Sequence, residues 1–194
     1  MNKLNRSDLY SLEKYAELRN EMRARAMAHK RDRRLPLGPN LTLYFEDRLT
    51  IQYQIQEMLR IEKIFEAQGI EEELKAYNPL IPDGGNWKAT MMIEFDDKEE
   101  RARKLACMVN IENTIWLRID DCEPVSPVAD EDLERTTEAK TSAVHFLRFE
   151  LTGTMINKLK NGAELCAGVD HEAYRYRVVP VPDNVRAALI RDLD

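Results

Sequence analysis

The sequence predicts an α+β fold, with a mixed, mainly antiparallel sheet, helices packed on one face of it, and an N-terminal helical arm. Segments with helical periodicity are interleaved with segments in which apolar and polar residues alternate. These predicted strands are half polar, whereas parallel strands covered on both faces are continuous apolar runs. The alternation therefore favours an antiparallel sheet over a doubly wound parallel one.

Composition places the chain among ordinary globular proteins. Its 194 residues suffice for one domain with a core, and its 43% hydrophobic and 33% charged residues are typical values. The N-terminus is polar from Asn2 onward and no long apolar run follows, so we expect a cytoplasmic protein without a membrane partner. The three cysteines are far apart in sequence, which argues against a disulfide framework and a metal–thiolate site. We expect neither a bound metal nor a cofactor.

The first 34 residues are predicted to form a basic helical arm. Apolar residues at helical spacing begin after Ser7, a good N-cap, and are followed by a run of seven cations between residues 19 and 34. The segment 35–39 contains two prolines and a glycine and is predicted to be a hinge, so residues 35–194 form a single α+β domain. The arm lacks interleaved aromatics and a recognition motif, so nucleic acid is not the expected partner. Docking on the acidic surface around 71–73, in the same chain or a neighbour, is the simpler hypothesis.

The stretch 40–65 organises the rest of the chain. Leu41, Leu43 and Phe45 alternate with polar residues and predict a short strand, and a helix is predicted from about Asp47 to a stop at Gly69. Apolar residues lie on more than one side of this helix. The helix is therefore expected to be covered on two faces, by the rest of the domain or by a second copy in a homodimer.

The remaining elements follow from periodicity and turn residues. A short helix over 70–77 leads into a loop from Tyr77 to Asn86, which is rich in proline, glycine and asparagine. Residues 124–141 form a polar, acidic excursion. Alternation predicts strands, and N-cap residues predict helices, over the following ranges: strands 89–95, 114–120, 143–151, 164–169 and 175–181, and helices that begin near residues 97, 152 and 183.

Three blocks of sequence resemble a bacterial family of uncharacterised proteins of about this length, a domain-of-unknown-function family. The blocks are Tyr44–Asp47 with Gln54–Arg60, Tyr77–Asp83 with Ala89–Glu94, and Gly168–Tyr174. The resemblance covers nearly the whole chain. It implies genes for rubrerythrin-like proteins and iron–sulfur oxidoreductases as neighbours, and hence a redox setting, but assigns no role to any residue.

Four residues are predicted to line a pocket, if the chain has one. The Tyr77–Asn86 loop supplies Asn78 and Asp83, Glu94 lies on the polar face of a strand, and His171 lies in a loop between two carboxylates. A carboxylate and an imidazole in one cleft are suited to acid–base chemistry or metal binding. His145 lies on an apolar strand face and is interpreted as a core histidine.

Three hypotheses remain for function, of which nucleic-acid binding by the basic arm ranks third. The first is a non-catalytic accessory protein, homodimeric, that works beside an iron–sulfur oxidoreductase or rubrerythrin-like partner. The alternative is a small-ligand-binding protein or enzyme that uses the Tyr77–Asn86 loop with Glu94 and His171. An intrinsic di-iron site is not expected, because no Glu-x-x-His pair occurs on the central helix.

Overall fold

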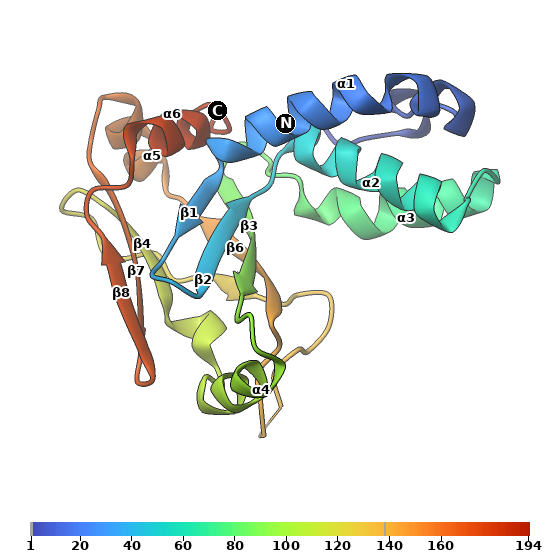
Figure 1. The fold of residues 1–194 in the computed structure, drawn as a ribbon. Coiled ribbons are helices and arrows are strands. Elements are labelled where there is room, and N and C mark those ends of the chain that lie inside the picture. The colour runs from blue at the N-terminus through green and yellow to red at the C-terminus, as the bar shows by residue number, and fades with distance from the viewer. Residues whose placement is uncertain (1, 138) are drawn as a thin grey trace.

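The computed structural model describes residues 2–137 and 139–194 and contains two antiparallel sheets and a projecting layer of helices (Figure 1). The α+β class is confirmed, but the described strands are divided between two sheets, and every pairing is antiparallel. One sheet has the order β1-β2-β3-β6-β5 and the other the order β4-β7-β8. The strands are β1 Arg34–Pro36, β2 Leu41–Phe45, β3 Asn86–Ile93, β4 Ile115–Ile119, β5 Val128–Ala129, β6 Val144–Glu150, β7 Leu165–His171 and β8 Tyr174–Val178.

Three helices form a lobe that extends away from the sheets in Figure 1. They are α1 Leu12–Arg31, α2 Arg48–Glu62 and α3 Ala67–Tyr77. The others are α4 Lys98–Cys107, α5 Gly153–Lys160 and α6 Asp183–Ile190. The N-cap of α1 is Ser11, whose hydroxyl accepts from the Lys14 amide, whereas the predicted cap Ser7 lies in a preceding 3-10 turn, Arg6–Asp8.

The main core contains the inward-facing side chains of both sheets. Trp87 and Phe149 are cross-strand neighbours on β3 and β6 and are fully buried, as are Leu117 of β4 and Val169 of β7. The Trp87 indole nitrogen donates to the carbonyl of Leu189, which fastens α6 to this core. Strands β4 and β6 bury one face each, as their alternation predicted, whereas β2, β3 and β7 are buried on both faces over most of their length.

The predicted hinge at residues 35–39 instead forms the end of β1 and the turn from β1 into β2 of the first sheet. Leu35 pairs with Leu43 in β1 and β2, and both Leu35 and Leu37 are buried in the core. Pro36 is tolerated because β1 is an edge strand, and Gly38 makes the turn into β2 with a φ of +83°. The hinge prediction was wrong because turn residues here terminate a paired strand.

The strand and helix predicted between residues 40 and 65 are confirmed as β2 and α2. The predicted stop at Gly69 is wrong, because α2 ends at Glu62 and Lys63 takes the left-handed conformation, with its amide bonded to the Leu59 carbonyl. Gly69 lies inside α3. Both α1 and α3 pack against α2, so its two apolar sides are covered within the chain and no longer argue for a second copy.

Two of the seven cations between residues 19 and 34 dock on carboxylates of the same chain, and not around Glu71–Glu73. Arg19 forms two hydrogen bonds with Glu57 of α2, and Arg33 pairs with Asp47 and Asp192. These contacts are made because α1 lies along α2, with its C-terminal end at the sheet (Figure 1). The division of the chain at residue 34 remains an expectation about domain organisation.

Glu57 of α2 binds two side chains of α1 and so holds the two helices together. Its carboxylate accepts from the Arg19 guanidinium at 2.8 and 2.9 Å and from the Tyr15 hydroxyl at 2.6 Å. The hydrogen bonds from Arg19, opposed by partial burial, lower the Glu57 pKa to about 2. Burial and the bond to Glu57 raise the Tyr15 pKa above its ordinary value.

We expect Glu57→Gln to destabilise the protein by about 1–2 kcal/mol at pH 7, because the Arg19 contact loses its charge. The pKa of Glu57 in the folded protein lies below its ordinary value of 4.5, so its contribution to stability is present above that pH and is lost as pH falls towards 2. Urea titrations at several pH values should show the two proteins converging at acid pH. Glu17→Gln, at a pair exposed to solvent, is the control, and an equal effect there would contradict the role of Glu57.

Candidate functional site

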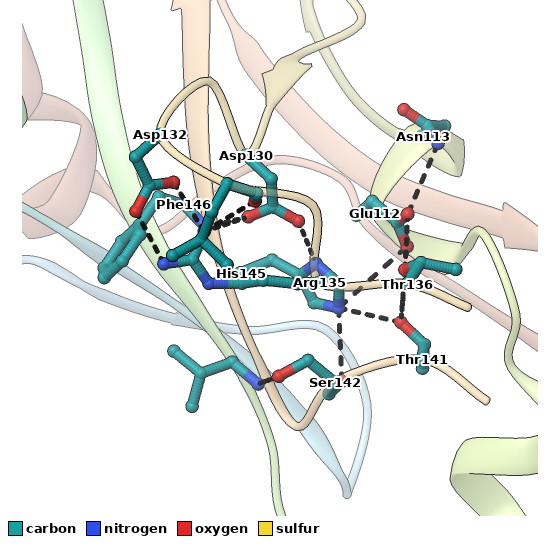
Figure 2. A network of polar contacts seen from close by, with 12 residues as sticks. Glu112, Asn113, Asp130, Asp132, Arg135, Thr136, Thr141, Ser142, His145 and Phe146 are labelled. Atoms are coloured by element: carbon teal, nitrogen blue, oxygen red, sulfur yellow. Dashed lines mark hydrogen bonds and ion pairs between the residues drawn. The ribbon is translucent and has the colours of Figure 1, made fainter.

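Glu112, Asp130 and His145 are hereafter called the cluster. Among the described residues 2–137 and 139–194 they are the only group of three or more His, Cys, Asp or Glu side chains placed to hold one metal ion. One ligand atom from each lies within 4.8 Å of the others. Figure 2 shows the three side chains converging from separate segments of the chain. Glu112 lies in the 3-10 helix Ile111–Thr114, Asp130 follows β5, and His145 belongs to β6.

Local geometry places each member of the cluster. His145 shares the inward face of β6 with Leu147 and Phe149, and its side chain is 0% exposed. Asp130 has a φ of +51°, and its backbone amide bonds to the Phe146 carbonyl, while its carboxylate accepts from the Phe146 amide at 2.9 Å. This turn brings the end of β5 back over His145.

Asp130 orients the imidazole of His145. Nδ1 of His145 lies 2.5 Å from Oδ2 of Asp130, so an Nδ1–H donates to the carboxylate. Nε2 then points to the other side of the ring, 2.8 Å from the Thr141 hydroxyl and 3.1 Å from the Ser142 carbonyl. The nearer Glu112 oxygen lies 4.0 Å from Nε2.

Glu112 is held by hydroxyl groups. Thr136 donates to Oε1 of Glu112 at 2.8 Å, and Thr141 contacts Oε2 at 3.4 Å. On the far side of the cluster, Arg135 contacts Asp130 at 3.3 Å and lies over the Phe146 ring, 4.6 Å from its centroid. The charge of Arg135 compensates part of the negative charge that two nearly buried carboxylates bring.

A cavity of about 440 Å³, hereafter the cluster cavity, lies beside these groups. Its lining includes Glu112, Asp130, Arg135 and Thr136. The cluster therefore offers an imidazole, two carboxylates and hydroxyl groups to anything that enters this space. These are donor types that first-row divalent cations use, and also groups that exchange protons with a ligand.

No pattern in the sequence reveals this site. The apolar strand face predicts a core histidine at His145, which its burial supports, but no motif marks Glu112, Asp130, Thr136 or Thr141. Asp130, Thr136 and Thr141 lie in the acidic excursion, whose polar composition resembles that of any exposed loop. No spacing in the sequence links these residues, because the contact depends on β5 pairing with β6.

Asn78 and Asp83 of the predicted site stabilise local structure. The Asn78 amide group accepts from the Leu4 amide and donates to the Leu4 carbonyl, both at 2.8 Å, which fastens the N-terminal segment. Asp83 accepts from the Gly85 amide at 3.1 Å and from the Asn86 side chain at 2.9 Å. Asp83 thus closes the turn that leads into β3.

Glu94 and His171 lie elsewhere. Glu94 follows the last residue of β3, whereas Asp83 precedes the first, and eight strand residues span roughly 25 Å. His171 ends β7, and its Nε2 lies 3.0 Å from the carbonyl of Val109, a residue that lines the cluster cavity. The structure does not bring the four predicted residues together, because β3 separates Asn78 and Asp83 from Glu94.

Part of the predicted loop does line a cavity. A space of about 550 Å³, hereafter the loop cavity, is bordered by Tyr77, Pro79 and Leu80, and by Phe146 from β6. Its charged lining includes Glu73, whose Oε2 is buried without a hydrogen-bond partner among the described residues. Desolvation raises the pKa of Glu73 above its ordinary value.

We expect Asp130→Ala to destabilise the protein by about 2–4 kcal/mol, because it leaves the buried Nδ1–H of His145 without an acceptor. Asp130→Asn should cost less, since asparagine tolerates a positive φ and its amide oxygen can replace one carboxylate acceptor. Urea denaturation of both variants checks this order. Equal losses below about 0.5 kcal/mol would show that the cluster contributes nothing to stability.

Comparisons with known proteins identify the family. A family model described as a protein of unknown function (DUF3501) matches residues 3–193. A crystal structure described as a novel protein of unknown function from Burkholderia pseudomallei is 52% identical, with a TM-score of 0.93 and 100% of each chain covered. No curated protein matches, and none of the described helices is long and apolar enough to cross a membrane. The resemblance found in the sequence is thus confirmed, and the chain belongs to the DUF3501 family.

Proposed function

We propose that this protein is a non-catalytic accessory protein that binds another protein through the far end of its helical lobe. One observation carries the proposal. Tyr10, Ile61 and Phe65 are large apolar side chains with 42%, 60% and 72% of their surface exposed. They are hereafter the apolar tip.

The apolar tip lies where α1 begins, α2 ends and α3 begins, at the end of the lobe remote from the sheets (Figure 1). A hollow of about 340 Å³ is lined by Tyr10 and Phe65 and by Leu12, Leu59 and Ile70. Polar side chains, Arg6, Ser11 and Glu13, also line this hollow. Exposed aromatic side chains beside a hollow with an apolar part and a polar rim are typical of protein interfaces. Covering the exposed Ile and Phe contributes about 1.5–3 kcal/mol each, which supports partner binding here.

The proposed partner is a redox protein, either an iron–sulfur oxidoreductase or a rubrerythrin-like protein. The resemblance to the family supports this choice through the gene neighbours that it implies. Glu62, the last residue of α2, and Glu66, the N-cap of α3, are neighbours in sequence of the apolar tip, so a partner surface with an apolar centre and a basic rim would be complementary. The competing hypothesis is that a second copy of the chain binds the apolar tip, as it would in the expected homodimer.

We expect the double substitution Ile61→Glu and Phe65→Glu to abolish partner binding and leave stability nearly unchanged, because both side chains are exposed. Affinity capture from native extract, with the bound protein identified by mass spectrometry and by its iron absorption, measures binding. Met27→Glu is the matched control, since Met27 is an exposed apolar residue of the same lobe. It should retain the partner.

Analytical ultracentrifugation separates the two occupants of the apolar tip. If the wild type is a dimer and the double variant is a monomer, the apolar tip binds a second copy of the chain and not a redox partner. A monomer that captures no iron protein, or captures it equally well in the double variant, would refute the proposal.

A second candidate function is binding of a small amphipathic ligand in the loop cavity. Its lining is largely apolar, and Lys88, Arg148 and Glu73 supply charges at its edge. Burial lowers the pKa of Lys88 and raises that of Glu73, so both groups lack full solvation by water. This combination of an apolar space with a few polar groups is typical of ligand sites.

If the loop cavity binds a ligand, native mass spectrometry of the freshly purified protein should reveal a non-covalent adduct. Leu80→Arg should abolish the adduct, because it places a charge in the apolar lining. Leu133→Arg, an exposed apolar position outside this lining, should retain it. A bare protein mass in the wild type, or an adduct that survives Leu80→Arg, would exclude this function.

A further inference from the structure

We infer that the cluster is a binding site for a first-row divalent cation, held between His145 and Glu112. In this arrangement Nε2 of His145 and Oε2 of Glu112 are direct ligands, and Asp130 supports the histidine from behind. Zn²⁺ and Mn²⁺ are the cations that this donor set suits, since an imidazole nitrogen disfavours Mg²⁺ and Ca²⁺.

The separation of the two ligand atoms supports this assignment. Nε2 of His145 and Oε2 of Glu112 are 4.0 Å apart, which is too long for a hydrogen bond. A tetrahedral cation bound to both at about 2.0–2.2 Å sets the two ligand atoms about 3.4 Å apart. The two side chains must therefore approach each other by about 0.6 Å to hold a cation between them.

The orientation of His145 is also that of a metal ligand. In metal sites the second ring nitrogen usually donates to a carboxylate or a carbonyl, which fixes the ring and increases its basicity. Here Asp130 accepts from Nδ1 at 2.5 Å and is itself held by the Phe146 amide. The ring is thus fixed with Nε2 on the side of Thr141, Ser142 and Glu112, as Figure 2 shows.

Further donors surround the same position. The Thr141 hydroxyl and the Ser142 carbonyl lie 2.8 and 3.1 Å from Nε2, and the Thr136 hydroxyl contacts Glu112. Glu112 lines the cluster cavity, so water can reach the site and complete the coordination shell. Together with the full burial of His145, these contacts make a built site with a route of entry.

Charge favours a cation over a neutral ligand. Asp130 and Glu112 bring two carboxylates into a nearly buried space, and Arg135 contacts only Asp130 of this pair. Glu112 has hydroxyl partners but no Lys or Arg nitrogen within 4 Å among the described residues. A divalent ion beside Glu112 would compensate the charge of this carboxylate. Any proton on Nε2 of His145 would be released to solvent when the ion binds.

The test is titration of the metal-free full-length protein with Mn²⁺, followed by electron paramagnetic resonance, and with Zn²⁺, followed by calorimetry. Mn²⁺ avoids the three free cysteines, because thiolates select softer ions. We expect one ion per chain. Glu112→Gln and His145→Gln should weaken binding by more than about 100-fold and Asp130→Asn by about 10–100-fold.

Glu134→Gln is the matched control, because Glu134 lines the same cavity but lies outside the cluster. It should bind both ions like the wild type. If His145→Gln does not fold, Glu112→Gln decides the matter, and addition of Mn²⁺ should raise the Tm of the wild type but not of this variant. Absence of Mn²⁺ and Zn²⁺ binding at millimolar concentration, or binding unchanged in Glu112→Gln, would overturn the assignment.

Discussion

Arg33 is a buried cation, 3% exposed, on which the arrangement of the helices depends. Its guanidinium makes two 2.7 Å bonds with Asp192 and a 2.9 Å contact with Asp47, and its Nε donates to His29 at 2.9 Å. Asp47 is the N-cap of α2, His29 lies in the last turn of α1, and Asp192 follows α6. Removing one partner would leave another charge buried and uncompensated, so the three helix ends are fixed together.

The ion pairs of Arg33 determine the position of the helical lobe relative to the sheets. β1 begins directly after Arg33, and the Phe45 amide bonds to the Arg33 carbonyl, so the ion network continues into the first sheet. Glu46 adds a link, because its carboxylate accepts from Thr50 of α2 and from Thr90 of β3. The near ends of α1 and α2 are therefore anchored, and the apolar tip lies at the opposite ends of these helices.

The cluster and the apolar tip belong to different parts of the molecule. The tip consists of residues at the ends of α1, α2 and α3, whereas the cluster lies between a 3-10 helix, β5 and β6. A cation bound at the cluster would stabilise the β5–β6 region without occupying the surface proposed for a partner. The two proposals are thus physically independent, and each set of variants leaves the other site intact.

The sequence by itself determined the α+β class, the β2–α2 unit and the alternating strands, because periodicity depends on which side of each element is buried. It did not determine that α2 ends at Glu62, because the left-handed cap there is Lys63, and the usual sequence signal for such a cap is a glycine. Tertiary structure alone decided the site. Glu112, Asp130 and His145 meet because the 3-10 helix Ile111–Thr114, β5 and β6 pack together, and contacts between distant segments leave no periodic trace in the sequence.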